Sequence, residues 1–293
     1  MFSQSESRPM PMHAPVVLSH YEVRPLVEAR RAGRAQVETS PDLGLSRVTV
    51  TLTPEGAHFP QGLLLRWEEA RTILEHPNLC YRLTTEGIEP LQAFSEVTGR
   101  VVQLYPTGTA PTVLLSGIAM HRVQGTDPWR DTREKIRAAR PRGRVLDTCM
   151  GLGYTAIQAA RQAEWVLTVE LDPAVLKLAR ANPWSRPLFT ATNIARVLGD
   201  VYDLVRGFPD ATFHVVIHDP PLFSLAGELY GRDFYRELWR VLKPGGRLFH
   251  YVGSPQTKMG RNLTRGVVAR LQEAGFRRVK RVPRAFGVVA VKG

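Results

Sequence analysis

Short apolar runs alternate with amphipathic stretches throughout the second half of the chain. The apolar runs lie around residues 145, 166, 196 and 215, and the helical stretches cover 155–163, 173–181 and 201–206. A further helix is expected from Pro128 to about Ala139, capped by Thr126 or Asp127, because proline suits the first helical position. Strands and helices that alternate in this way predict an α/β fold with a parallel sheet.

The first of these apolar runs leads into a glycine turn. Residues 145–155 read Val-Leu-Asp-Thr-Cys-Met-Gly-Leu-Gly-Tyr-Thr, so the run ends at Asp147, and Gly151 and Gly153 precede the next helix. Glycine lets the backbone approach a ligand closely and adopt conformations that a Cβ forbids. A strand, a glycine turn and a helix in this order are typical of the first unit of a nucleotide-binding fold.

Each of the four strands is followed by an acidic residue. These are Asp147, Glu170, Asp200 and Asp219. Any one of them could equally be a helix cap or a solvated turn. Together they predict a ligand site, because the carboxyl ends of parallel strands meet at one edge of a sheet. Glu170 lies about 20 residues beyond the glycine turn, where a carboxylate can accept both hydroxyls of a ribose.

On these residues, the region 126–293 resembles the S-adenosylmethionine-dependent methyltransferases with the Rossmann-like seven-stranded fold. The resemblance implies that S-adenosylmethionine is the cofactor. Its methionine part would lie on Asp147, Gly151 and Gly153, its ribose on Glu170 and its adenine amine on Asp200, with Tyr154 and Val201 beside them. Residues 242–248 look like the family's turn into its fifth strand, and 286–291 like its antiparallel last strand. Cys149 departs from the family, since many members have glycine there.

The segment after the fourth strand, Asp219-Pro220-Pro221-Leu222-Phe223-Ser224, resembles the motif of methyltransferases that act on amino nitrogens. An amine on an aromatic ring is a poor nucleophile because its lone pair is delocalised. Asp219 and the Pro220 carbonyl can accept its two N–H groups, and the two prolines stiffen the loop. The family's aromatic position holds Leu222, with Phe223 one residue later. A dinucleotide dehydrogenase would explain the glycine turn but not this motif.

The acceptor pocket is expected to use residues from the loop that follows this motif and from the region before the first helix. The candidates are Phe223, Ser224, Glu228, Tyr230 and His121. Residues 252–261 are long and polar enough for an acceptor-binding flap. Phe234, Tyr235 and Trp239 are expected in the core. His218 and His250 end strands near the site, but no Cys/His pair has the spacing of zinc ligands, so no metal is expected.

The charge of the chain points to a polyanionic partner. Its 39 Lys and Arg against 27 Asp and Glu give a formal net charge of +12, with clusters at 30–34, 137–144 and 277–284. One such cluster is usually a solvated face, and arginine-rich composition can follow base content. Three clusters on one enzyme favour nucleic acid, with RNA ahead of DNA. The sequence does not indicate an oligomeric state.

Other features of the composition bound the class of protein. No run reaches the ~18 apolar residues of a membrane span, so no membrane partner is expected. The two cysteines, Cys80 and Cys149, do not form a disulfide framework, and a reducing cytoplasm fits. The 293 residues, 43% of them hydrophobic, suffice for two domains with cores.

The first half of the chain predicts a different organisation. Residues 1–15 are expected to be a disordered lead, and 16–125 a smaller α+β domain for substrate presentation or for structure alone. Its expected elements are a helix at 26–34 with Pro25 near its start, a hairpin of 35–39 and 47–53 around the turn 41–44, a helix at 67–75, and strands at 101–104 and 112–115.

These observations favour methyl transfer from S-adenosylmethionine to an amino nitrogen of a nucleic-acid base, RNA preferred. Two alternatives remain open: a polyamine aminopropyltransferase, and a non-catalytic RNA-binding protein that retains the fold. The run from Asp219 to Pro255 also resembles a mostly archaeal, uncharacterised group. Some of its relatives are thought to modify RNA cytidine amines, and others are described as spermidine-synthase-like.

Overall fold

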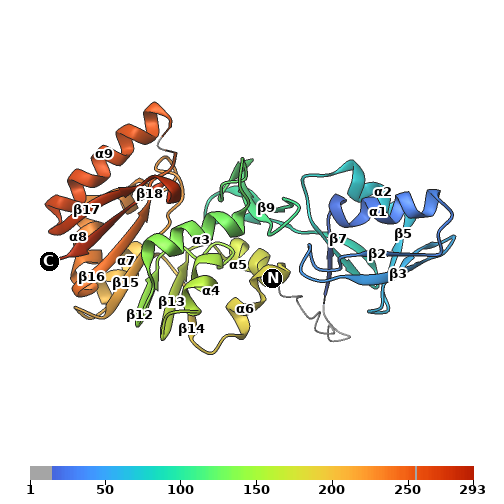
Figure 1. The fold of residues 1–293 in the computed structure, drawn as a ribbon, viewed down its shortest axis with the longest axis horizontal. Helices are drawn as coiled ribbons and strands as arrows, with labels where there is room; N and C mark the ends of the chain where they lie inside the picture. Colours follow the sequence, from blue (N-terminus) through green and yellow to red (C-terminus); the bar gives the residue numbers. More distant parts are fainter. Residues whose placement is uncertain (1–14, 255) are drawn as a thin grey trace, which may run out of the picture. The chain divides into compact units, whose positions relative to one another are not determined.

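Two compact units make up the chain in the computed structural model, which describes residues 15–254 and 256–293 (Figure 1). The first contains the residues up to Pro128 together with Lys177–Arg186, and the second contains Trp129–Leu176 and Pro187–Gly293. No sequence pattern predicted that 177–186 groups with the first unit. The domain boundary after residue 125 stays a prediction. The lead predicted at 1–15 lies outside the described residues except for Pro15.

A seven-stranded sheet with the order β14-β13-β12-β15-β16-β18-β17 forms the centre of the second unit. Its strands are β12 (Arg144–Asp147), β13 (Trp165–Glu170), β14 (Ile194–Leu198), β15 (Phe213–His218), β16 (Leu242–Tyr251), β17 (Phe276–Val282) and β18 (Gly287–Lys292). The strands from β14 to β16 are parallel, and β18 runs antiparallel between β16 and β17. This confirms a mixed α/β fold with a mainly parallel central sheet.

The direction of strand order reverses between β12 and β15, which is where open sheets of this kind bind ligands. Both strands are buried along nearly their whole length, which explains their continuous apolar runs. On one face, Leu146, Val216 and Leu248 share a core with α7 (Val201–Leu204), α8 (Arg232–Val241) and α9 (Lys258–Glu273). The expected core position of Phe234 and Tyr235 on α8 is confirmed, and Trp239 packs against the same core.

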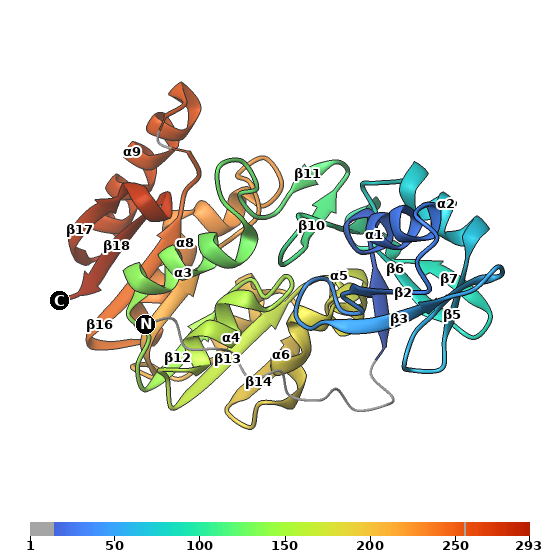
Figure 2. The ribbon, with the colours of Figure 1, turned by 45° about the vertical axis from the view of Figure 1, so that its right-hand side comes forward.

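The opposite face carries α3 (Pro128–Ala139) and α4 (Tyr154–Ala160), both labelled in Figure 2, and α4 packs on β12 and β13. Arg247 on β16 donates through Nε to the carbonyl of Ala138, at 2.9 Å. Gln158 on α4 donates through Nε2 to the carbonyl of Trp129, at 3.2 Å. These bonds fix α3 at both ends, and its predicted bounds are confirmed, as are those of α5 (Pro173–Ala181).

Two expectations for the second unit were wrong in detail. Residues 242–248 do not turn into β16, because β16 already begins at Leu242 opposite Phe213. Its pairing then jumps to Val215 opposite Arg247, so 243–246 bulge out of the ladder. The predicted flap at 252–261 is shorter than expected, because α9 begins at Lys258 and Thr257 caps it by accepting from the N–H of Gly260, at 3.0 Å.

The part of the first unit at residues 15–127 contains small antiparallel sheets and two helices. Its elements are β1 (Val16–Leu18), α1 (His20–Arg31), β2 (Gln36–Thr39), β3 (Val48–Leu52), β4 (Gly56–His58), β5 (Leu64–Arg66), α2 (Trp67–Glu75), β6 (Tyr81–Thr84), β7 (Gly87–Pro90), β8 (Gln92–Ser95), β9 (Arg100–Tyr105), β10 (Thr112–Leu115) and β11 (Ile118–Ala119). The hairpin of β2 and β3, the helix α2, and the strands β9 and β10 were predicted. The short strands β1, β4 to β8 and β11 were not predicted.

The start of α1 was also predicted wrongly. The sequence pattern suggested a helix at 26–34 with Pro25 near its start, but α1 begins at His20 and contains Pro25. The hydroxyl of Ser19 accepts from the N–H of Tyr21, and the Glu22 carboxylate accepts from the N–H of Ser19, at 2.9 Å. This capping box of serine followed by glutamate three residues later is the true start signal.

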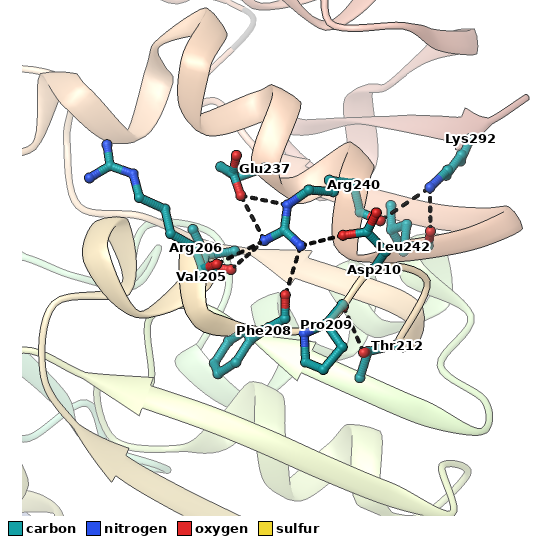
Figure 3. A network of polar contacts seen from close by, with 10 residues as sticks. All are labelled: Val205, Arg206, Phe208, Pro209, Asp210, Thr212, Glu237, Arg240, Leu242 and Lys292. Carbon is teal, nitrogen blue, oxygen red and sulfur yellow. Dashed lines mark hydrogen bonds and ion pairs between the residues drawn. The ribbon is translucent and has the colours of Figure 1, made fainter.

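Arg240, near the end of α8, ties this helix to the segment before β15 (Figure 3). Its guanidinium donates to the carbonyls of Val205 and Phe208, at 2.9 and 2.7 Å, and to the carboxylates of Asp210 and Glu237, at 2.6 and 2.8 Å. The planar guanidinium has enough donors to satisfy all of these acceptors together. Arg240 therefore fixes the loop that leads into the strand preceding Asp219.

We predict that Arg240→Ala lowers the free energy of unfolding by about 2 kcal/mol, because several acceptors lose a charged donor. The control is Arg236→Ala, one turn earlier on α8, where the exposed guanidinium lies 3.7 Å from Asp233 and the expected loss is below about 0.5 kcal/mol. Urea denaturation of the two variants measures both values. Equal losses would show that the network contributes nothing specific.

Candidate functional site

Asp147, at the end of β12, is a completely buried carboxylate. Its Oδ2 accepts from the hydroxyls of Thr155, at 3.1 Å, and Thr168, at 2.7 Å. Its Oδ1 is also buried, and no hydrogen-bond partner for it occurs among the described residues. Burial raises the pKa of Asp147 to about 7, although the two threonines oppose the shift. A buried acceptor without a donor is costly, so this oxygen marks a place for a ligand's donor group.

Glu170, at the end of β13, is held by the backbone of the glycine turn. Its Oε2 accepts from the N–H of Gly151, at 2.8 Å, and its Oε1 accepts from the N–H of Asp172, at 3.0 Å. Desolvation raises the pKa of Glu170 to about 7, and these two bonds lower it by less. The side chain is still partly exposed. Each carboxylate oxygen has a second lone pair for a ligand hydroxyl.

The two glycines of the turn are required for different reasons. Both have positive φ, +53° at Gly151 and +79° at Gly153. A Cβ on Gly153 would lie 2.5 Å from a methyl carbon of Leu188, whereas one on Gly151 would meet nothing within 4 Å. The turn therefore leaves open space in front of Gly151. Tyr154 follows with a buried ring that contacts Trp129 edge to face, at 5.6 Å.

Asp200 lies at the start of α7 and is exposed. Its Oδ1 accepts from the N–H of Tyr202, at 2.8 Å, which caps the helix and fixes the orientation of the carboxylate. Val201 is the first residue of α7 and is buried. The structure thus places Asp200 at the end of β14 as expected, with a capping role alongside the adenine contact that the resemblance implies.

Asp219 follows β15 and forms a buried ion pair that the sequence analysis missed. Its Oδ2 lies 2.6 Å from Nζ of Lys135 on α3, which also lies 3.1 Å from Oδ2 of Asp131. The Lys135 ammonium stands over the ring of Tyr251, at 4.3 Å from its centroid. Lys135 and Asp131 are buried, and 14% of the Asp219 side chain is exposed. The only sequence signal was the spacing of Asp131 and Lys135, four residues apart on one helix.

The loop after Asp219 is held from beneath by an aromatic residue. The hydroxyl of Tyr230 donates to the carbonyl of Pro221, at 2.8 Å, and its buried ring contacts Phe223 edge to face, at 5.4 Å. Phe223 is 50% exposed and Leu222 46% exposed, so both can meet an acceptor. Ser224 and Glu228 are exposed on the same loop. Tyr230 therefore supports the loop, and Phe223 presents a ring at its surface.

His121, the remaining acceptor candidate, lies in the first unit, where its Nδ1 is 2.9 Å from the Thr112 hydroxyl. The strand-end carboxylates all lie in the second unit. The predicted contact of His121 with an acceptor stays a prediction.

Two buried histidines lie behind Asp219, at the ends of β15 and neighbouring β16. The rings of His218 and His250 are 4.4 Å apart. Nε2 of His218 lies 3.0 Å from the carbonyl of Leu229, which can only accept, so Nδ1 accepts from the Thr148 hydroxyl at 2.7 Å. The hydroxyl of Tyr235 lies 2.8 Å from Nε2 of His250. Burial lowers the pKa of His218 to about 3, so this layer is neutral.

Three further features bear on the class of site and of protein. Within residues 15–254 and 256–293, no three His, Cys, Asp or Glu residues are grouped as metal ligands would be. Cys149 is a free, partly buried thiol, and burial raises its pKa well above the ordinary value, which leaves little reactive thiolate. In the part of the chain that the structure describes, no helix has the length and apolar character needed to cross a membrane.

Comparisons with known proteins support a methyltransferase-like domain. Residues 145–246 match a family model described as a methyltransferase domain. The uncharacterized protein MJ1233 of Methanocaldococcus jannaschii is 54% identical over 193 residues, which cover 65% of this chain and 66% of that protein. Polyamine aminopropyltransferase 2 of Streptomyces coelicolor is 29% identical over 177 residues, which cover 57% of this chain and 30% of that enzyme.

A solved structure shows the same fold. A spermidine synthase, crystallised with the transition-state analogue AdoDATO, superposes with a TM-score of 0.56 and 17% identity, covering 69% of this chain and 73% of that one. The chain spans just under two thirds of the Methanocaldococcus protein and less than a third of the aminopropyltransferase. Together these matches support an enzyme of the S-adenosylmethionine-dependent methyltransferase-like superfamily.

The neutral histidine layer predicts a pH effect on stability. Below its ordinary pKa of 6.5, His218 takes up a proton in the unfolded chain but not in the folded one until about pH 3. Stability is therefore lost as pH falls from 6.5 towards 3. We predict that, between pH 7 and pH 5, the wild type loses about 2 kcal/mol more than His218→Asn, whose amide keeps a donor and an acceptor.

The measurement is chemical denaturation of both proteins at the two pH values. Asp147 and Glu170 have raised pKa values in the fold, so their contribution to stability changes with pH in the opposite direction to that of His218. This contribution is the same in both proteins and cancels in the comparison. The same pH dependence in both proteins would mean that His218 is protonated in the fold.

Proposed function

We propose that this protein transfers the methyl group of S-adenosylmethionine to an amino nitrogen of a nucleic-acid base, with RNA as the preferred acceptor. The observation that carries the proposal is the position of three strand-end carboxylates. Asp147, with its unpartnered buried oxygen, and Glu170 lie on the two strands that flank the glycine turn, and Asp219 follows the neighbouring strand β15.

The residues at this edge fit S-adenosylmethionine. Oδ1 of Asp147 can accept from the cofactor's amino group, and the remaining lone pairs of Glu170 can accept from the ribose hydroxyls. The open space at Gly151 admits the backbone approach that the methionine part needs. When bound, the cofactor supplies an electrophilic methyl group on a sulfonium. Both carboxylates have pKa values near 7, and a cationic ligand would favour their ionised forms.

Asp219 and its loop then orient the acceptor. A carboxylate that accepts an N–H from the acceptor amine turns the nitrogen lone pair towards the methyl group. Lys135 holds one oxygen of this carboxylate, and Tyr230 holds the loop through Pro221. The exposed ring of Phe223 supplies a stacking surface for a base. The protein's contribution in this scheme is positioning, which can supply much of the rate enhancement of such a displacement.

The RNA part of the proposal rests on basic surfaces of the second unit. The exposed basic residues of α9 and β17 include Arg261, Arg265, Arg277, Arg278, Lys280 and Arg281. On α3, Arg133 and Arg137 are exposed four residues apart, which puts them on one face of the helix, and Arg140 directly after the helix is also exposed. β17 is the edge strand of the sheet, and charges there also prevent pairing with another chain. Edge protection needs charge of either sign, whereas phosphate binding needs positive charge, so charge reversal should impair only phosphate binding.

A polyamine aminopropyltransferase is the second candidate, because 57% of this chain matches part of the Streptomyces enzyme. Such an enzyme would act on an aliphatic amine with a cofactor of similar shape, so Asp147 and Glu170 would keep their roles. The two candidates differ at Asp219, which would meet a neutral base amine in one case and an alkylammonium in the other.

The chemistry is tested by incubating the protein with total RNA and labelled S-adenosylmethionine, followed by mass spectrometry of the nucleosides. We predict an N-methylated base with the wild type. Asp219→Ala should lose more than 100-fold in turnover while keeping cofactor affinity. Glu170→Ala should weaken cofactor binding by about 1–3 kcal/mol, the scale of hydrogen bonds to a charged group. Glu164→Ala, an exposed acid just before β13, is the control for both.

The outcomes separate the candidates. Methylated nucleosides that persist in Asp219→Ala would remove Asp219 from the mechanism. Aminopropyl transfer to spermidine from decarboxylated cofactor, with unmodified RNA, would establish the second candidate.

The RNA surface is tested by reversing charge at three positions. We predict that Arg277→Glu, Arg278→Glu and Arg281→Glu together weaken RNA binding about tenfold or more and flatten its salt dependence, because fewer counterions are released. Cofactor affinity should not change. The control reverses Arg24, Arg47 and Arg71, which are exposed in the first unit, with the same change in net charge. Filter binding at several salt concentrations gives both slopes, and equal losses would mean that only net charge matters.

A further inference from the structure

A protonated lysine occupies the interior of the second unit at the point where the acceptor amine is proposed to arrive. The Lys135 side chain is 1% exposed, and its ammonium lies 2.6 Å from Asp219 Oδ2 and 3.1 Å from Asp131 Oδ2. It also stands over the ring of Tyr251, at 4.3 Å from the centroid. Every one of these contacts favours the charged form of the amine.

The ammonium is a permanent part of the structure. Burial acts to lower the pKa of Lys135, but Asp219 and Asp131 together with Tyr251 hold it above the ordinary value. The side chain leaves α3 within a helix fixed by Arg247 at Ala138 and by Gln158 at Trp129. Removing the ammonium from Asp219 would leave charge uncompensated in a buried place. Asp219 therefore keeps a cation on one side in every step of an acceptor's approach.

This arrangement distinguishes two kinds of acceptor amine. The amino group of a base is neutral near pH 7, and an alkylamine is protonated, as a lysine side chain is. A neutral amino group can donate to Asp219 without meeting a like charge. An alkylammonium at the same carboxylate would come within a few ångströms of the Lys135 ammonium, where two like charges repel strongly.

The need to deprotonate the acceptor also distinguishes a neutral base amine from an alkylammonium. An alkylammonium must lose a proton before its nitrogen can attack, so it needs a base. A carboxylate that already accepts a bond from an ammonium at 2.6 Å is stabilised in its ionised form and is a poor proton acceptor. It remains a good hydrogen-bond acceptor. Asp219 is thus suited to orienting a neutral amine and unsuited to deprotonating a charged one.

We infer that Lys135 is a positioning and selectivity-determining residue, which holds Asp219 and restricts the acceptor to neutral amino groups by excluding cationic polyamines. The inference rests on the proposed function in one respect, that Asp219 meets the acceptor. It goes beyond it by assigning the choice between a base and a polyamine to a residue on α3.

The test removes the ammonium without changing the net charge of the cluster. In the wild type, Asp131, Lys135 and Asp219 together carry one negative charge, and Asp131→Asn with Lys135→Met also leaves one, on Asp219. Spermidine binding is measured by calorimetry with S-adenosylhomocysteine present. We expect at least tenfold tighter spermidine binding by the double variant than by the wild type. Adding Asp219→Asn to the double variant should abolish the gain in spermidine affinity, which would show that the spermidine binds at this carboxylate.

Two single variants separate charge from structure. Lys135→Arg keeps a cation and should still exclude spermidine, while Asp131→Asn alone makes the cluster neutral and should not gain binding. Thermal unfolding shows which variants fold. The wild type gives a second measurement that needs no variant, the affinity for cytidine, whose amino group is neutral, against that for 1,3-diaminopropane, whose amines are charged. We expect cytidine to bind at least tenfold more tightly.

Tight spermidine binding by the wild type, a folded double variant without any gain, or preference of the wild type for the diamine would each overturn the inference. These results are independent of RNA methylation. If the wild type excludes polyamines and the double variant admits them while no RNA is modified, the inference stands and the proposed acceptor fails. If RNA is methylated but Lys135→Met with Asp131→Asn leaves amine selectivity unchanged, the proposed function stands and the inference fails.

Discussion

The ion pair between Lys135 and Asp219 determines the electrostatics of the candidate site. Four acids lie at or beneath this edge, Asp131, Asp147, Glu170 and Asp219, and the Lys135 ammonium contacts two of them, Asp131 and Asp219. Burial raises the pKa values of Asp147 and Glu170 to about 7, and neighbouring carboxylates add a smaller upward shift. A cofactor that carries a sulfonium and an ammonium would supply the missing positive charge. Beside the Lys135 ammonium, the buried carboxylates thus leave a site that favours positive charge from its ligand.

The acidic edge contrasts with a chain of net charge +12. A polyanion is repelled by the strand-end carboxylates and attracted by the exposed arginines of α3, α9 and β17. Its backbone would therefore lie on the basic surfaces, and only a neutral group, such as a base swung out of its stack, could reach Asp219. A free polyamine would face the opposite fields, with repulsion from the surface and attraction to the edge. The Lys135 ammonium removes part of that attraction at the point of reaction.

The sequence was sufficient where the signals are local. The glycine turn, the strand-end acids and the helices α3 and α5 follow from patterns within about a dozen residues, and the structure has them where they were expected. The pair of Lys135 with Asp219 joins residues 84 positions apart, and Asp131 and Lys135 look like an ordinary surface pair on a helix. Their burial depends on how α3 packs against β16, which no local pattern encodes.

The other errors have a similar origin. The bulge at 243–246 depends on the register of β16 against β15. The Pro-Gly-Gly run there was predicted as a turn before the strand, but β16 pairs with β15 on both sides of it. At α1, the prediction gave Pro25 more weight than the capping box at Ser19, because a proline usually breaks a helix interior, whereas α1 continues through Pro25. In both cases a proline suggested an element boundary, and strand pairing at β16 or helix capping at α1 determined the boundary instead.

The neutral histidines explain how the charged edge is kept apart from the apolar core. His218 immediately precedes Asp219, and its two ring nitrogens are used by Thr148 and the Leu229 carbonyl. The ring is held in one tautomer, so β15 ends in a fixed direction. The Leu229 contact also connects to Tyr230, which supports Pro221. The position of Asp219 is therefore set from three sides, by the neutral layer behind it, the loop in front of it and Lys135 on α3.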